Sequence, residues 1–223
     1  MWSQVEKDLE GLLVAKIYPV LKTDPIYRQF LSFAGVGPNF PASVAAIPEP
    51  ARSNFAKVAK MRAHLAVAEI AKSGGLVESQ SCAKLIQAHT VLYRFWDSKA
   101  PDRRTGIWWF DASVIVVCKR EAGRTAKERH AWLREHLAVC LDWSKMDRID
   151  ILTLTGADEL PVVEGTGSPM GLYSRSGLLR GDVEPKVYYT ALGKFFPGGM
   201  KQTVLPFIPT SQGQDLTSFL SRA

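Results

Sequence analysis

The chain has 223 residues, of which 46% are hydrophobic and 22% are charged, an ordinary balance for a globular protein that buries a core. Lysine and arginine number 28 against 22 aspartates and glutamates, and this excess favours anionic partners in general. The three cysteines are widely spaced and form no Cys-x-x-Cys pair, so the sequence predicts neither a disulfide framework nor a zinc site.

The first 80 residues predict a helical region. Apolar residues recur at helical spacing near the N-terminus, and residues 23–35 begin with an Asp-Pro start signal and end at Gly35. Residues 51–75 predict a further helix that stops at Gly74, with an apolar side formed by Phe55, Val58, Leu65 and Ala68. The segment 79–88, SQSCAKLIQA, is interpreted as a short fourth helix.

After residue 88 the composition changes to one that is typical of strands. Five segments are rich in Val, Ile, Thr and aromatic residues and are separated by Gly, Pro, Asp and Ser. They are TVLYRFW (90–96), GIWWFDASVIVVCK (106–119), RIDILTLTG (148–156), KVYYTALGKFF (186–196) and TVLPFIP (203–209).

One prominent helix interrupts these strands. Thr125 and Glu128 have the spacing of a capping box, and an apolar periodicity follows them. The glycine- and serine-rich stretch 164–181 predicts an irregular functional loop. The sequence therefore predicts an α+β fold, with a helical region over residues 1–80 and a mixed, mainly antiparallel domain over residues 81–223.

Arg94 is an unusual residue for an apolar strand. One reading is structural, because a strand arginine can lie on the solvent face or pair with Asp97. The other is functional, because a buried guanidinium requires an anion and its planar fork suits a phosphate. The residue types alone leave both readings open.

The adjacent Trp108 and Trp109 belong to one predicted strand and should therefore point to opposite faces. We expect one to fill the core and the other to line a cleft, where its flat surface would suit an aromatic ring such as a nicotinamide or a base. Ser113, further along the same segment, could brace Arg94 through a hydrogen bond. No histidine pair has metal-ligand spacing, and no phosphate-binding loop or hydrolase elbow is found.

Taken together, these segments resemble the skeleton of the ADP-ribosyltransferase-like superfamily, particularly its compact bacterial toxin and effector members and its NAD glycohydrolase relatives. Tyr93-Arg94 matches the aromatic-Arg strand of the superfamily, and the segment from Trp109 to Ser113 matches the strand that ends in small hydroxyl residues. Gln202, before Val-Leu-Pro, matches the element that closes the catalytic core. The chain departs from the superfamily here, because Gln202 or Thr203 stands where the catalytic glutamate is usual.

The resemblance implies an enzyme that cleaves the nicotinamide–ribose bond of NAD and transfers ADP-ribose to a macromolecular acceptor. NAD would be a consumed substrate, with no separate cofactor and no metal. The catalytic residues implied are Arg94, which anchors NAD, and Gln202, or failing that Glu164, which holds the ribose hydroxyls. Binding of NAD would also involve Trp108 or Trp109 stacking on the nicotinamide, Ser113 bracing the site, and Tyr93.

Two other interpretations remain open. The chain could be an NAD glycohydrolase without a protein target, or a non-enzymatic basic α+β module that binds a protein or, less in keeping with its scattered basic residues, nucleic acid. The resemblance further implies an immunity or delivery partner. No apolar stretch is long enough to span a membrane and the N-terminus has no classical signal peptide. We therefore expect a cytoplasmic protein, or one secreted into a target cell by another route.

Overall fold

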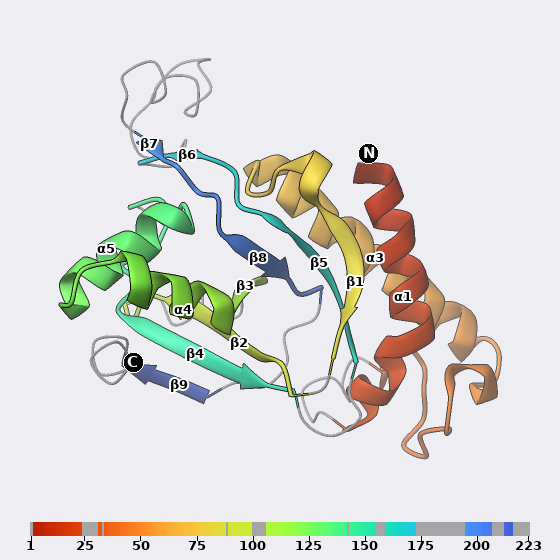
Figure 1. Ribbon diagram of the computed structural model, residues 1–223. Coiled ribbons are helices and arrows are strands. Elements are labelled where there is room, and N and C mark those ends of the chain that lie inside the picture. Colours follow the sequence, from red (N-terminus) through yellow and green to blue (C-terminus); the bar gives the residue numbers. More distant parts are fainter. Residues whose placement is uncertain are drawn as a thin grey trace.

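The structure is a computed structural model that describes residues 2–23, 31–32, 34–87, 89–99, 106–141, 143–154, 159–172, 195–206 and 212–215. Its fold is α+β, as the sequence predicted: two long helices come first, and an antiparallel sheet with two shorter helices follows (Figure 1). None of the described helices is long and apolar enough to cross a membrane.

A sheet occupies the centre of the described part of the chain. Its seven strands follow the order β1 (Cys82–Ile86), β5 (Leu160–Thr166), β8 (Lys201–Val204), β3 (Trp108–Asp111), β2 (Val91–Trp96), β4 (Arg148–Thr153) and β9 (Gln212–Asp215). Every pair of neighbours is antiparallel, which confirms the prediction of a mainly antiparallel sheet. The short strands β6 (Met170–Gly171) and β7 (Phe195–Phe196) pair with each other separately.

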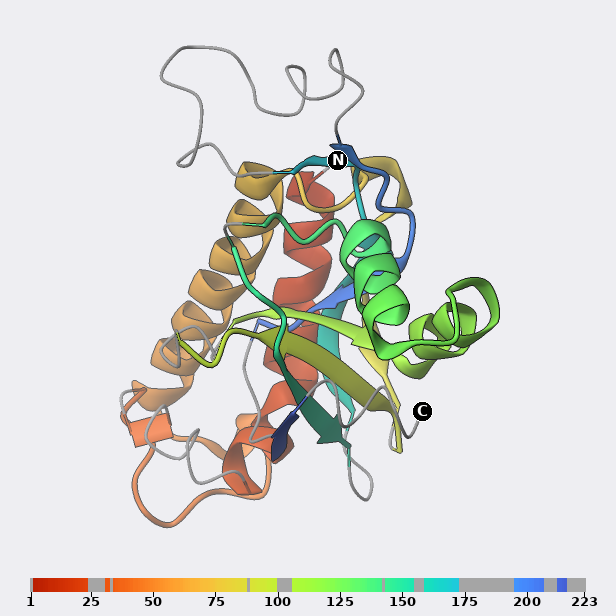
Figure 2. The ribbon, with the colours of Figure 1, turned by 90° about the vertical axis from the view of Figure 1, so that its left-hand side faces the viewer.

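Two groups of helices pack on different parts of this sheet. α1 (Trp2–Thr23) packs against α3 (Ala51–Ser73) and contacts β1 and β5, while α4 (Ala112–Glu121) and α5 (Ala126–His136) lie beside β2 and β3 (Figures 1 and 2). Two one-turn 3-10 helices, Val44–Ala46 and Glu78–Gln80, flank α3 in the chain. One hydrophobic core joins α1 and α3 to the sheet, so the helical region packs directly onto the strands.

The buried side of α3 differs from the predicted one. Phe55 is buried as expected, but Leu65 and Ala68 are exposed and Val58 is only half-buried. Its buried side consists mainly of small residues: Ala51, Phe55, Ala59, Ala63, Ala66, Val67 and Ile70. Because alanine is short, this surface lets α1 approach closely, so the largest side chains were a poor guide to the core face. The helix ends at Gly74 as predicted, with a φ of 60° that glycine adopts at low cost.

The segment 106–119 was predicted as one strand, and this prediction is wrong after Asp111. β3 ends there and α4 begins, because Asp111 caps the new helix: its side chain accepts a hydrogen bond from the backbone N–H of Ser113. Val114, Ile115 and Cys118 then form a buried side at helical spacing. The second part of the chain therefore has two helices where one was predicted. The predicted capping box of α5, Thr125 with Glu128, is confirmed.

Two further predictions are wrong. The segment interpreted as a short helix at 79–88 contains strand β1, whose residues pair with β5. The stretch predicted as an irregular loop from Glu164 begins as the end of β5 and continues into β6. In both cases cross-strand pairing overrides the local preference. Most of the helix predicted at 23–35, residues 173–181 of the loop and residues 186–194 of the strand predicted at 186–196 lie outside the described residues.

Candidate functional site

Arg94 is held inside the sheet at the centre of β2. Its side chain is 8% exposed, and it lies directly opposite Asp150 of β4, which is fully buried. Cross-strand partners have Cβ atoms about 5 Å apart, so a buried cation and a buried anion are neighbours on one face. Gly106 lies against the guanidinium, since a Cβ at this glycine would come within 2.1 Å of Nη2 of Arg94. The arginine therefore occupies a fixed position.

A half-open cavity of about 470 Å³ adjoins Arg94. Its walls come from five parts of the fold: the seven-stranded sheet, the glycine before β3, the end of α3, the segment that follows α5, and β6. Four residues singled out in the sequence line it, namely Arg94, Trp108, Trp109 and Gln202. Residues from three strands that are separated in the sequence thus share one cavity.

The two tryptophans differ in burial, as predicted for adjacent strand residues, yet both line the cavity. Trp109 is 1% exposed, and its indole Nε1 has no hydrogen-bond partner among the described residues. A buried N–H without a partner costs free energy, so an acceptor on a bound molecule would be favourable there. Trp108 is half-buried and packs on Gly75 at the end of α3.

Gln202 in β8 closes the cavity between the sheet and α5. Its Nε2 donates a hydrogen bond of 3.0 Å to the backbone carbonyl of Leu137. Gly167 packs so tightly on the amide that a Cβ there would lie 2.4 Å from Nε2. The carbonyls of Val139 and Cys140 accept hydrogen bonds from the buried Arg134, which fixes the segment after α5.

The other three predicted site residues lie elsewhere. Tyr93 alternates with Arg94 along β2 and stacks on Phe110, with ring centroids 5.7 Å apart. Glu164 pairs with Thr203 in the register, whereas Gln202 pairs with Gly165, so Glu164 and Gln202 point to opposite faces of the sheet. Ser113 is exposed in the first turn of α4. None of the three is among the residues that line the cavity.

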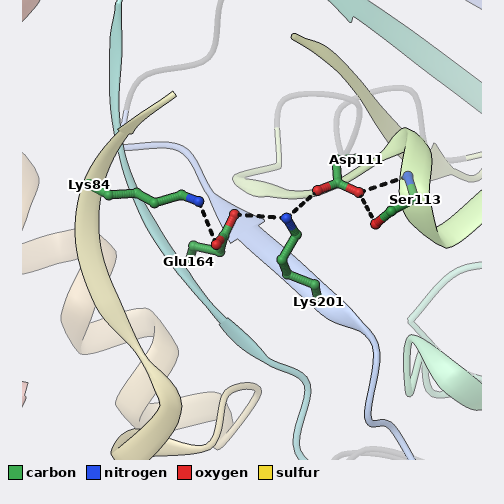
Figure 3. Close-up of polar contacts among 5 residues, drawn as sticks. All are labelled: Lys84, Asp111, Ser113, Glu164 and Lys201. Atoms are coloured by element: carbon green, nitrogen blue, oxygen red, sulfur yellow. Dashed lines mark hydrogen bonds and ion pairs between the residues drawn. The ribbon is translucent and has the colours of Figure 1, made fainter. Parts of the chain in front are cut away.

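Glu164 and Ser113 belong instead to a chain of polar contacts across β1, β5, β8 and β3 (Figure 3). Lys84 Nζ lies 2.5 Å from Glu164, Lys201 Nζ lies 3.4 Å from Glu164 and 2.5 Å from Asp111, and Asp111 accepts from Ser113. The two lysines and two carboxylates thus neutralise one another, which makes this polar chain self-contained.

Contacts within the polar chain shift the pKa values of Asp111 and Lys201. Burial raises the pKa of Asp111, but hydrogen bonds from Lys201 and Ser113 lower it by more, so this pKa lies below its usual value. Burial likewise lowers the pKa of Lys201, while Asp111 and Glu164 raise it by more. Both groups therefore remain charged at neutral pH, which fits a structural role for the chain.

Several residues that line the cavity carry no motif by which the sequence would identify them. They include Glu69 and Ser73 from α3 and Trp143 and Ser144 from the segment after α5. Glu69 is an ordinary helix residue with no motif around it, and only the packing of α3 beside the sheet brings it to the cavity. No pattern in the sequence distinguishes it from the exposed glutamates of other helices.

The described residues contain no cluster of three or more His, Cys, Asp or Glu that could hold a metal ion. Instead the cavity combines a buried guanidinium, a free indole N–H, an amide and several aromatic walls. Such a surface suits a flat ring with anionic or hydrogen-bond-accepting groups attached. The chain has no significant match among protein-family models, curated proteins or solved structures.

Proposed function

We propose that this protein consumes NAD, cleaving its nicotinamide–ribose bond and transferring ADP-ribose to a macromolecular acceptor. A single observation supports the proposal best: Arg94, Trp108, Trp109 and Gln202, which the sequence places in three separate segments, line the same cavity. A chance arrangement of strand residues would not be expected to bring together a cation, two tryptophans and a glutamine from β8.

The residues present suit the parts of NAD. The fork of Arg94 would bind the pyrophosphate or the nicotinamide ribose, and Trp108 would stack on the nicotinamide ring. The free N–H of Trp109 would donate to an acceptor of the dinucleotide. Gln202 would hydrogen-bond to the ribose hydroxyls, while Leu137 keeps its amide oriented. The breaking bond passes through an oxocarbenium-like transition state, so precise positioning of the ribose supplies much of the catalysis.

Hydrolysis without a protein target is the second candidate function. It is favoured by the amide of Gln202 at the position where a carboxylate would activate an acceptor group. In that case water takes the place of the acceptor and free ADP-ribose is the product. An effector or toxin could use either reaction, because both deplete NAD.

The proposal is tested by incubating the purified protein with NAD labelled in the nicotinamide ring, with and without cell lysate. We expect nicotinamide release above background in both arms. Label from the adenine part of NAD that becomes attached to a lysate protein supports transfer, and release of free ADP-ribose alone supports hydrolysis. If the native protein releases no nicotinamide in either arm, the proposed function is wrong. A binder of nucleic acid would instead lose affinity for a DNA or RNA oligonucleotide steeply with rising salt.

A further inference from the structure

Glu69 is a carboxylate on the wall of the cavity, and no sequence motif marks it. It lies in the last two turns of α3, and Ser73, four residues later on the same side of the helix, also lines the cavity. Gly75, just after the helix, packs against Trp108. The end of α3 therefore places an acidic side chain in the same cavity as the tryptophan that would stack on the nicotinamide ring.

The carboxylate of Glu69 is free. Among the described residues that line the cavity it is the one acidic side chain, and it makes no hydrogen bond or ion pair with any described residue. The acidic groups nearby in the sheet are all occupied or enclosed: Glu164 and Asp111 contact lysines, and Asp150 is fully buried opposite Arg94. Glu69 thus faces the cavity with its negative charge uncompensated.

We infer that Glu69 is the catalytic carboxylate of the NAD-cleaving reaction, an assignment that rests on the proposed function. A negative charge stabilises positive charge that develops on the ribose, and a carboxylate can also remove a proton from the incoming nucleophile. Gln202 can do neither, because its amide is uncharged and not basic, and Glu164 lies outside the cavity, paired with two lysines. Glu69 on α3 therefore supplies the carboxylate that β8 lacks at Gln202.

The step balances as follows when water is the acceptor. The bond between ribose C1′ and the pyridinium nitrogen breaks, and its electron pair goes to the nitrogen, so nicotinamide leaves as a neutral molecule. A water oxygen bonds to C1′, and Glu69 takes one proton from that water and later returns it to solvent. NAD and water thus become nicotinamide, ADP-ribose and one proton. With a protein acceptor, a nucleophilic side chain replaces the water and loses its proton to Glu69.

The matched variants are Glu69→Gln and Glu135→Gln. Both positions are exposed glutamates on helices, but Glu135, on α5, does not line the cavity. We expect Glu69→Gln to lower the single-turnover rate of nicotinamide release by about 100-fold, the lower end of what general bases contribute, with the dissociation constant for NAD changed less than about threefold. Glu135→Gln should keep the native rate. Since Glu69 is exposed, thermal melting should show that its variant folds normally.

The outcomes separate this assignment from the proposed function. Native protein that releases nicotinamide, together with a Glu69→Gln variant whose rate is within threefold of native, overturns the role of Glu69 and leaves the proposed function standing. A Glu69→Gln variant that binds NAD much more weakly but turns it over at the native rate also overturns the role, since Glu69 would then contribute to binding only. Native protein that releases no nicotinamide overturns both.

Discussion

Gly75 lies directly against the indole ring of Trp108: a Cβ at residue 75 would lie 2.5 Å from Cη2 of the tryptophan. This contact joins the end of α3 to the start of β3, two elements that the sequence separates by more than 30 residues. It fixes the position of Trp108 in the cavity that Glu69 and Ser73 also line. The N-terminal helical region is thereby part of the cavity.

The first prediction follows from this contact. Gly75→Ala should push Trp108 from its position, since real Cβ contacts are never that short, and overpacking of this kind costs about 1–3 kcal/mol of unfolding free energy. Urea denaturation and the tryptophan emission spectrum would measure both effects. Gly37→Ala is the matched control, because a Cβ there meets nothing within 4 Å. A Gly75→Ala protein with native stability and emission would contradict the packing described.

A second prediction concerns the cap of α4. Asp111→Ala removes both the hydrogen bond to the N–H of Ser113 and the ion pair with Lys201, and should cost about 0.5–2 kcal/mol. Asp111→Asn keeps a good capping residue and loses only the partly exposed ion pair, so its cost should stay below about 1 kcal/mol. Chemical denaturation would distinguish the two. Equal losses would show that the cap contributes nothing.

The pH dependence of the same pair gives a third prediction. The pKa of folded Asp111 lies below 3.8, so its contribution is present above that pH and is lost as the pH falls through the folded pKa. The pKa of folded Lys201 lies above 10.5, so its contribution is present below that pH and is lost as the pH rises through the folded pKa. The stability difference between native protein and Asp111→Asn should therefore be flat from about pH 5 to 9 and shrink outside this range. A difference that grows below pH 4 would contradict these shifts.

The fourth prediction concerns Gln202. In Gln202→Glu a carboxylate oxygen replaces the amide group that donates to the carbonyl of Leu137, so two acceptors face each other in a buried position. We expect a loss of about 1–3 kcal/mol at pH 7 and a smaller loss near pH 5, where protonation restores a donor. Denaturation at the two pH values would measure it. A stabilised variant would mean that residue 202 is poised for a carboxylate.

The cysteines offer a fifth prediction. Burial raises the pKa of the Cys118 thiol to about 11, and Cys140 is also buried, whereas Cys82 is exposed on β1. A thiol reagent at pH 8 should therefore modify one thiol rapidly in the native protein and the other two only after denaturation. Rapid modification of all three, or of none, would contradict the placement of β1 and α4.

The sequence predicted the elements whose signals are local. The capping box at Thr125 and the glycine stop at Gly74 identify their helices, because the signal lies within a few residues of the boundary. The prediction from sequence was wrong at Asp111, where strand-forming residues continue into a helix that a single side chain caps. It was also wrong at β1, which is a strand because β5 pairs with it. Pairing partners distant in the chain cannot be recognised from a local pattern.

In the candidate site, too, residues within local motifs could be predicted, and residues placed by distant packing could not. Arg94, the tryptophans and Gln202 belong to strands with distinct motifs and were selected from them, and they do line one cavity. Glu164 was selected for its place in the chain, but strand alternation turns it toward Lys84 and Lys201. Glu69 was missed because its position depends on how α3 packs beside the sheet.

The most direct test of the NAD-cleaving cavity is nicotinamide release by the native protein, Arg94→Lys and Glu164→Gln, each first shown to be folded by circular dichroism. Arg94→Lys keeps the positive charge but loses the planar fork, and should lower the rate by about 100-fold. Glu164→Gln, altered outside the cavity at a residue that pairs with Lys84 and Lys201, should stay within about threefold of native. A native rate in folded Arg94→Lys, together with a lost rate in Glu164→Gln, would contradict the account and place the chemistry at the polar chain that contains Glu164.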